Sequence, residues 1–147
     1  MKKNVFTIVL LVFFSCSSSK KAQTKENKIL ESFVITEVSR NKSYGLTPKN
    51  PVEVGGSFES GACNERRYLN LLTGPNGEMI SYYRAGSCCP IKSENGFNGM
   101  AMLDNYRVTW ENSKDTISIY INLYDKGELK VPIGFGFKNP QVQFLEQ

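Results

Sequence analysis

Apolar and polar residues alternate with a period of two along much of the chain after residue 29. The alternation is clearest in residues 106–110 and 117–123, where every second side chain is apolar. A period of two is typical of a β-strand that buries one face. Because residues 112–115 between these two segments are turn formers, the pattern predicts an antiparallel hairpin.

Other segments give less direct predictions of secondary structure. Residues 32–39 are rich in β-branched and aromatic side chains, and residues 79–85 follow the turn formers of residues 74–77, so we expect a strand in each. Residues 64–72 fit two structures. Asn64 could cap a short helix, or the segment could form the first arm of a hairpin, and we favour the hairpin.

The remaining segments contain many prolines and glycines. Residues 44–56 include Pro48 and Pro51 and are predicted to be extended and turning. Residues 131–137 are predicted as a final strand, which Pro132 weakens. Together these segments predict a mainly β domain over residues 29–147: a small antiparallel sandwich or open barrel of about six or seven strands, with at most one short helix.

The first fifteen residues differ from the rest of the chain. Lys2 and Lys3 precede an apolar run over residues 5–14 that only Thr7 interrupts. A basic start followed by a short apolar run is typical of a secretory signal peptide, and the run is too short for a stable membrane-spanning helix. We therefore predict a signal peptide over residues 1–15.

Residues 13–16, Phe-Phe-Ser-Cys, resemble a lipobox, the bacterial signal for attaching a diacylglyceryl group to a cysteine and cleaving the chain just before it. Phe13 and Phe14 depart from the residues that are usual at these positions, so a signal peptide with a chance cysteine is the alternative. The serines that follow Cys16 favour the lipobox. The resemblance implies that Cys16 carries the lipid, becomes the new N-terminus and anchors the protein in the bilayer.

The residues after Cys16 also bear on location. In lipoprotein families an Asp at the next position favours retention in the inner membrane, and an acidic cluster often marks export to the cell surface. This chain has Ser17 and then lysines. The resemblance therefore implies a cell-envelope protein with an outer-membrane lipid anchor that faces the periplasm.

The positive charge of the chain is concentrated near its N-terminus. The whole chain has 18 Lys and Arg against 14 Asp and Glu, a net charge of +4. Residues 29–147 contain 12 basic and 13 acidic residues, so the domain is almost neutral. The excess lies in the signal peptide and in residues 16–28, a predicted lipidated and flexible tether close to anionic head groups. Because the domain has no basic excess, we exclude nucleic acid as a partner.

Length and composition exclude several classes of function. At 147 residues the chain is too short for a (β/α)₈ barrel, which takes about 200 residues or more. It contains no histidine, so Ser-His-Asp triads, Cys-His dyads and His-bearing zinc sites are absent. Residues 95–99 are glycine-rich but lack the lysine of a phosphate-binding loop. We predict no catalytic residues, no cofactor and no metal site.

Cys63, Cys88 and Cys89 remain after lipidation of Cys16, and the cell envelope is an oxidising compartment. A Cys88–Cys89 bond would close a strained ring, whereas Cys63 with either neighbour would close a loop of about 25 residues, which stabilises a fold by about 3 kcal/mol. Pro90 biases Cys89 towards an extended conformation, in which adjacent side chains point to opposite faces. We expect Cys63 to pair with Cys88 or Cys89, and a thiol redox switch is the alternative.

Five charged residues are candidates for a ligand-binding patch: Glu65, Arg66, Arg67, Glu78 and Arg84. If residues 64–72 and 79–84 pair as strands, their guanidinium and carboxylate groups converge on a surface suitable for an anionic ligand. Ordinary cross-strand ion pairs explain the same residues and are favoured. Asp104 is expected in a turn or on a solvated strand face.

Several short motifs resemble those of a family of small Gram-negative lipoproteins. They are NERRYLN at residues 64–70, GPNGE at 74–78, YRAGSCCP at 83–90, LDNY at 103–106, INLYD at 121–125 and PIGF at 132–135. The resemblance covers most of residues 33–137, and GSCCP is its most distinctive part. No activity is established for the family, so it supplies no catalytic residues. It implies a membrane-anchored periplasmic lipoprotein with a structural role or a binding role, for a small ligand or an unknown envelope protein.

Some members of this family are labelled 2-dehydro-3-deoxyphosphooctonate aldolase. That enzyme is a cytoplasmic barrel that condenses phosphoenolpyruvate with arabinose 5-phosphate. This chain is too short for the barrel and has no phosphate loop, and its predicted export signal would separate it from both substrates. We treat the label as a misnomer, and keep aldolase activity and thiol redox chemistry at Cys63, Cys88 and Cys89 as the alternatives.

Overall fold

The computed structural model describes residues 35, 37–55 and 58–138, all of which belong to one unit, Phe33–Gln147. The predicted signal peptide, Cys16 and the predicted tether lie outside these residues. Among the helices of the described part, none is both long enough and apolar enough to span a bilayer.

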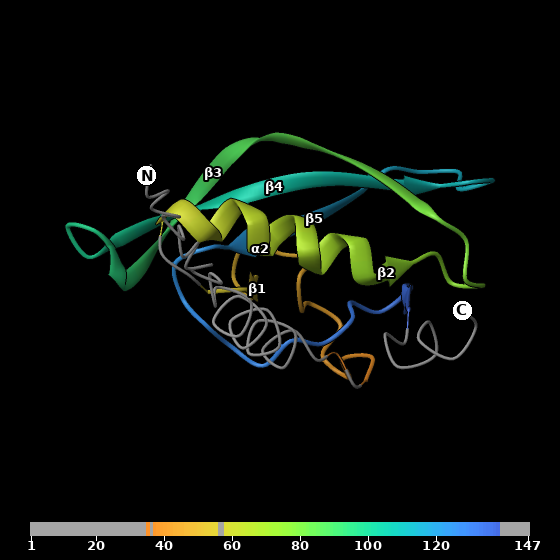
Figure 1. The fold of residues 1–147 in the computed structure, drawn as a ribbon, viewed down its shortest axis with the longest axis horizontal. Coiled ribbons are helices and arrows are strands. Elements are labelled where there is room, and N and C mark those ends of the chain that lie inside the picture. Colours follow the sequence, from red (N-terminus) through yellow and green to blue (C-terminus); the bar gives the residue numbers. More distant parts are fainter. Residues whose placement is uncertain (1–34, 36, 56–57, 139–147) are drawn as a thin grey trace, which may run out of the picture. The chain divides into compact units, whose positions relative to one another are not determined.

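Four strands form the main sheet, in the order β1-β5-β4-β3 (Figure 1). They are β1 (Val52–Glu53), β3 (Ile80–Phe97), β4 (Met100–Trp110) and β5 (Ile117–Asn122). β4 is antiparallel to both of its neighbours, whereas β1 runs parallel to β5. The predicted hairpin of residues 106–110 and 117–123 is confirmed, since Val108 pairs with Ile117 in the β4–β5 register.

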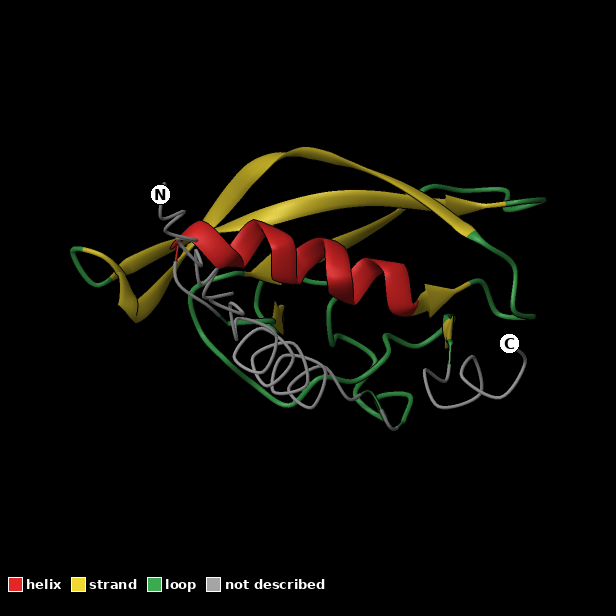
Figure 2. Cartoon of the chain, in the orientation of Figure 1, coloured by secondary structure: helices red, strands yellow, loops and turns green. Residues whose placement is uncertain are grey.

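One helix, α2 (Phe58–Leu71), lies along one face of the main sheet (Figure 2). The expectation that residues 64–72 form a hairpin arm is therefore wrong, and Asn64 lies inside the helix rather than capping it. Four fully buried residues follow the spacing i, i+3, i+4 and i+7 of one helix face and its continuation: Glu65, Tyr68, Leu69 and Leu72. Burial of this face against the sheet favours the helix, because most helical stability in proteins comes from tertiary contacts.

A second, two-stranded sheet pairs β2 (Leu72–Thr73) with β6 (Gly136–Phe137) in antiparallel orientation. The final strand predicted over residues 131–137 is thus much shorter than expected. Before β6, the predicted segment forms only one bridge, between Val131 and Val38. This is also the only bridge in the described part of residues 32–39, where a strand is expected. Pro132 has no backbone N–H to donate, and it interrupts the strand at this point.

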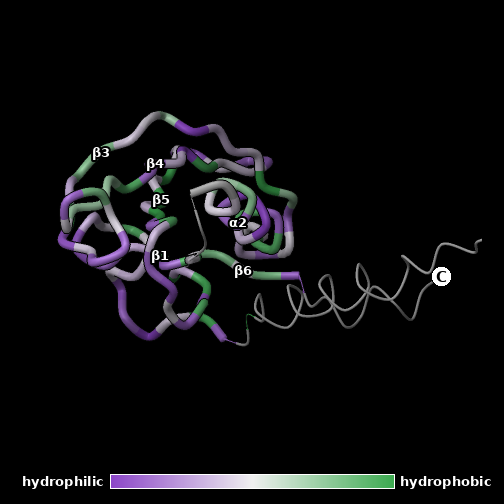
Figure 3. Tube along the Cα trace, turned by 60° about the vertical axis from the view of Figure 1, so that its left-hand side comes forward, coloured by the Kyte–Doolittle hydropathy of each residue, from purple (hydrophilic) through white to green (hydrophobic). Residues whose placement is uncertain are grey.

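The core lies between α2, the main sheet and the segments near both ends of the described chain. Figure 3 shows the strands β3, β4 and β5 on one side of α2 and β6 beneath it. The buried core residues outside the helix are Ile35, Val52, Val54, Leu72, Tyr106, Val108, Ile119, Ile121, Leu129, Val131 and Phe135. The prediction of a mainly β domain is confirmed: the described residues form six strands, in open sheets of four and two, and one helix.

Gly61 determines how closely α2 approaches the chain that leaves β5. A Cβ at this position would lie 2.8 Å from Leu123 Cδ1 and 2.9 Å from Leu123 Cβ. The Leu123 Cβ cannot rotate away, so an added methyl group forces the helix outwards. We expect Gly61→Ala to lower the free energy of unfolding by about 1–2 kcal/mol, although alanine in an exposed helix favours folding by about 1 kcal/mol relative to glycine.

Urea unfolding of Gly61→Ala, Leu123→Ala and the double variant tests this contact. The loss caused by Gly61→Ala should be smaller in the Leu123→Ala background, because the Leu123 Cδ1 and Cγ contacts are then absent. An equal loss in both backgrounds, or a gain in stability, would contradict the close approach of helix and sheet.

Candidate functional site

A buried carboxyl group lies between α2 and the main sheet. Glu65 is fully buried, and its Oε2 accepts a hydrogen bond of 2.9 Å from Tyr106 Oη on β4. Its other oxygen, Oε1, has no hydrogen-bond partner among the described residues. An ionised carboxylate with an unpaired buried oxygen is strongly disfavoured, so Glu65 is the first candidate for an altered protonation state.

An ion pair adjoins Glu65 on the same face of the sheet. Arg84 on β3 donates from Nε and Nη2 to the two oxygens of Asp104 on β4, with an Nη2–Oδ1 distance of 2.7 Å. Ser87 Oγ donates to Asp104 Oδ1 at 3.0 Å. The register places Arg84 opposite Tyr106 and Ser87 opposite Asp104, so these side chains share one face. Asp104 is buried, whereas the Arg84 side chain is 46% exposed, so the ion pair runs from the interior to solvent.

These surroundings favour a proton on Glu65. Burial and the negative charge of Asp104 raise the pKa of Glu65 to about 7. Burial and the neighbouring Glu65 also raise the pKa of Tyr106, whose phenol therefore stays protonated and remains the donor. Protonated Glu65 can donate to Asp104, whereas ionised Glu65 cannot, and this interaction also favours the neutral acid. Glu65 can thus hold a proton near neutral pH.

The predicted ligand patch does not form as one surface. Of its five residues, only Glu65 and Arg84 lie in the same cluster, where their charges interact. Arg66 and Arg67 are exposed on other faces of α2, and Glu78 closes the turn before β3. The prediction fails because the segment that carries the first three residues is a helix, which turns successive side chains in different directions.

The sequence contains a signal for Asp104 that the expectation of a solvated strand face missed. Asp104 lies in the same alternating phase as Tyr106 and Val108, both of which are buried in the core. A carboxylate in the apolar phase of a strand indicates a buried polar contact, and Asp104 is only 5% exposed. Glu65 likewise lies on the same face of the helix as Tyr68 and Leu69, both of which are buried in the core.

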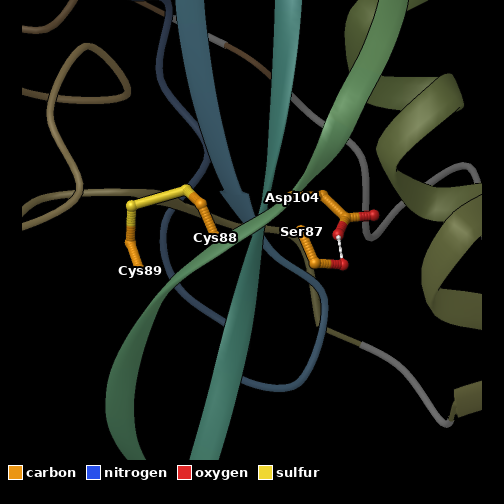
Figure 4. The surroundings of a disulfide bond; sticks show 4 residues. All are labelled: Ser87, Cys88, Cys89 and Asp104. Carbon is orange, nitrogen blue, oxygen red and sulfur yellow. Dashed lines mark hydrogen bonds between the residues drawn. A yellow bond between two sulfur atoms is a disulfide. The ribbon is translucent and has the colours of Figure 1, made fainter.

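The cysteines pair differently from the prediction. The structure joins Cys88 to Cys89 and leaves Cys63 free and exposed on α2, so the expected bond to Cys63 is wrong. The β3 register shifts between Cys88 and the proline after Cys89, and Cys89 has a φ of 54° instead of the expected extended conformation. This bulge brings the two neighbouring side chains together. Figure 4 shows the disulfide on the side of β3 away from Ser87 and Asp104.

A polar cleft of about 750 Å³ is formed by different residues. Its lining comes from residues 37–53 and 127–130, which backbone hydrogen bonds hold together. Gly127 N donates to Glu53 O at 3.0 Å, and Val131 N donates to Glu37 O at 3.0 Å. No alternating pattern or motif marks these residues in the sequence, and sequence reasoning missed the cleft.

Hydrogen bonds around Lys130 give part of the cleft a fixed geometry. Lys130 Nζ lies 2.7 Å from Glu37 Oε1 and 3.2 Å from Glu128 Oε2. The Lys130 ammonium accordingly lowers the pKa of Glu37. Tyr44 Oη donates to the Glu128 carbonyl oxygen at 3.2 Å and accepts from Lys130 N at 3.1 Å. Side chains and backbone thus hold each other in place here.

Three further lining residues keep their charges available. Among the residues that the structure describes, Arg40, Lys49 and Glu53 take part in no ion pair. Burial and the nearby charge of Asp125 raise the pKa of Glu53. The cleft therefore offers a guanidinium, an ammonium and a carboxyl group to a ligand, next to the ion pairs of Lys130 with Glu37 and Glu128.

Neither a metal-binding cluster nor a similar protein indicates a function for these sites. In residues 35, 37–55 and 58–138, no group of three or more His, Cys, Asp or Glu side chains is arranged to hold a metal ion. The chain matches no protein-family model, no curated protein and no solved structure. The resemblance to small Gram-negative lipoproteins stays a prediction.

The raised pKa of Glu65 makes the stability of the fold depend on pH. The folded protein holds this proton up to a pH of about 7, whereas an unfolded glutamate releases it near its ordinary value of 4.5. Between these values the folded state binds more protons than the unfolded chain. The free energy of unfolding should therefore fall as the pH rises through this window, by up to about 3 kcal/mol, and this group should contribute no slope outside it.

Glu65→Gln should remove this pH dependence. The amide nitrogen can donate to Asp104 as the protonated acid does, and the amide oxygen can still accept from Tyr106. Urea unfolding at several pH values between about 4.5 and 8 measures the slope. The exposed Glu94→Gln is the matched control and should keep the wild-type slope. A wild-type slope in Glu65→Gln would show that another group is responsible.

Proposed function

We propose that the protein is a lipid-anchored cell-envelope protein whose β-rich domain binds a small hydrophilic ligand in the polar cleft. The observation that carries this proposal is the cleft, whose volume of about 750 Å³ is in the range of small-molecule sites. The sequence of residues 1–28 supports the lipid anchor, because a signal-peptide pattern precedes a lipobox-like cysteine at Cys16. The proposed location is the outer membrane, with the domain facing the periplasm.

The charges of the cleft favour a ligand that carries both signs. Three lining residues are basic and three are acidic: Arg40, Lys49, Lys130, Glu37, Glu53 and Glu128. A ligand with a large charge of one sign would meet repulsion from half of them. A zwitterionic ligand, with a carboxylate for Arg40 or Lys49 and an ammonium for Glu53, can satisfy groups that are unpaired in the described structure.

The buried cluster supports a structural role and not a catalytic one. Glu65 has no access to solvent, and Arg84 engages both oxygens of Asp104. An acid or base that acts on a substrate must come within hydrogen-bonding distance of it. The cluster instead joins α2 to β3 and β4. No observation at either site favours aldolase activity, which is not part of this proposal.

The proposed tether would keep the cleft near the membrane. Residues 17–28 are polar and without periodicity, and a flexible chain of this length has an end-to-end distance of about 20 Å. Its lysines would lie close to anionic head groups. The domain would thus remain close to the bilayer and meet ligands in the periplasm.

Replacement of the lipidated cysteine tests the anchor. We expect Cys16→Ser to move the protein from the membrane fraction to the soluble periplasmic fraction and to abolish incorporation of labelled palmitate, because no other acyl chain would hold it. Cys63→Ser is the matched control and should remain membrane-bound and labelled. Membrane association of Cys16→Ser equal to that of the wild type would contradict the lipid anchor.

Nuclear magnetic resonance with small hydrophilic probes tests the cleft. Short zwitterionic peptides should shift the amide signals of residues 37–53 and 127–130, and uncharged N-acetylglucosamine oligomers should shift them less. Lys49→Ala should weaken peptide binding by about tenfold, because it removes one charged contact. The exposed Lys114→Ala is the control and should bind as the wild type does. Shifts confined to other residues, or none at millimolar peptide, would contradict the proposal.

A further inference from the structure

The Cys88–Cys89 disulfide lies on the outer strand of the main sheet. β3 pairs with β4 on one edge only, and both cysteines are partly exposed. Solvent-exposed disulfides are the ones that other thiols can attack, and they are commonly labile or regulatory. This bond is therefore open to exchange in a way that a core disulfide is not.

The backbone at Cys89 has a conformation that its residue type disfavours. Its φ of 54° lies in the left-handed region, which residues other than glycine rarely adopt, and the following proline favours an extended conformation instead. The β3–β4 register shifts at this point. The bond between the adjacent sulfur atoms ties the two side chains together, so it holds Cys89 in this conformation. Two separate thiols would not constrain the backbone of Cys89 in this way.

The register before the disulfide is fixed independently of it. Arg84 and Ser87 both donate to Asp104, which lies opposite Ser87 on β4. These bonds hold the strand up to the residue that precedes Cys88. Release of Cys89 therefore leaves this part of the hairpin in place, and any change of register falls on the part beyond it.

The register beyond the disulfide positions the tip of the β3–β4 hairpin, residues 93–99. Ser93 Oγ and Asn95 Nδ2 donate to Asp125 Oδ1 at 2.7 and 2.8 Å. These bonds attach the tip to the segment that follows β5. A shift of one residue in a strand turns its side chains to the opposite face. Such a shift beyond Cys89 would withdraw both donors from Asp125.

We propose that Cys88 and Cys89 are a thiol–disulfide exchange site for a dithiol reductant, and that reduction releases the hairpin tip from Asp125. A thiolate of the dithiol attacks one sulfur of the pair, the S–S bond breaks, and the other cysteine leaves as a thiolate and takes up a proton. The second thiol of the reductant then displaces the protein sulfur. The reductant is oxidised to a disulfide, and two protein thiols are formed.

Reduction of the full chain with dithiothreitol, followed by alkylation and hydrogen exchange, tests this site. Cys63 should be alkylated before and after reduction, whereas Cys88 and Cys89 should be alkylated only after it. Amide exchange in residues 93–99 should become about tenfold faster on reduction, and exchange in residues 80–87 should stay unchanged. Cys63→Ser should respond as the wild type does.

The double variant Cys88→Ser/Cys89→Ser should show the fast exchange of residues 93–99 without any reductant. Because oxidised and reduced wild type are compared directly, the test holds even if this variant does not fold. A peptide that links Cys63 to Cys88 or Cys89 would overturn the site. Release of two thiols with unchanged exchange in residues 93–99 would overturn the switch. Neither measurement involves a cleft ligand, so its failure is distinct from failure of the proposed function.

Discussion

The contact between one face of α2 and the main sheet is the constraint on which the described structure depends. That face buries Tyr68 and Leu69 and, with them, the carboxyl group of Glu65. A carboxyl group in this position is tolerated only when it is neutral or well paired. Tyr106 donates a hydrogen bond to Glu65, and Asp104 can accept one from the protonated Glu65 carboxyl group. The position of the helix therefore requires these two polar side chains at neighbouring core-facing positions of β4, where an apolar pair would leave Glu65 without a partner.

The outer strand β3 meets a different constraint, because it is 18 residues long and has one unpaired edge. Long regular edges can pair with other chains, and natural sheets interrupt them with bulges. The β3–β4 register shifts near Gly86, at Cys89 and beyond Lys92. The irregularity that makes the disulfide possible is thus also one of the features that limit pairing at this edge. A reduced and more regular β3 would have to be protected in another way.

Sequence alone predicts the parts of the fold that local patterns determine. The β4–β5 hairpin is predictable because its alternation and its turn are both local. The helix is not, because the short apolar spacing of residues 64–72 also fits a strand, and burial against a sheet formed later in the chain decides between them. Asp104 is detectable from its phase in β4. The Cys88–Cys89 bond depends on a register that only pairing with β4 sets, and the cleft joins segments that are distant in sequence, so neither leaves a local signal.

Asp125 links the proposed exchange site to the proposed ligand cleft, because it accepts hydrogen bonds from the hairpin tip and its charge acts on Glu53. Burial acts to raise the pKa of Asp125, but hydrogen bonds from Asn122, Asn95 and Ser93 keep it below its usual value. Two of these donors come from the hairpin tip, and the charge of Asp125 in turn raises the pKa of Glu53 in the cleft. Withdrawal of the tip would leave the Asp125 carboxylate less stabilised and change the field at Glu53. A thermodynamic link of this kind acts in both directions, so a ligand that pairs with Glu53 would also alter how firmly Asp125 holds the tip.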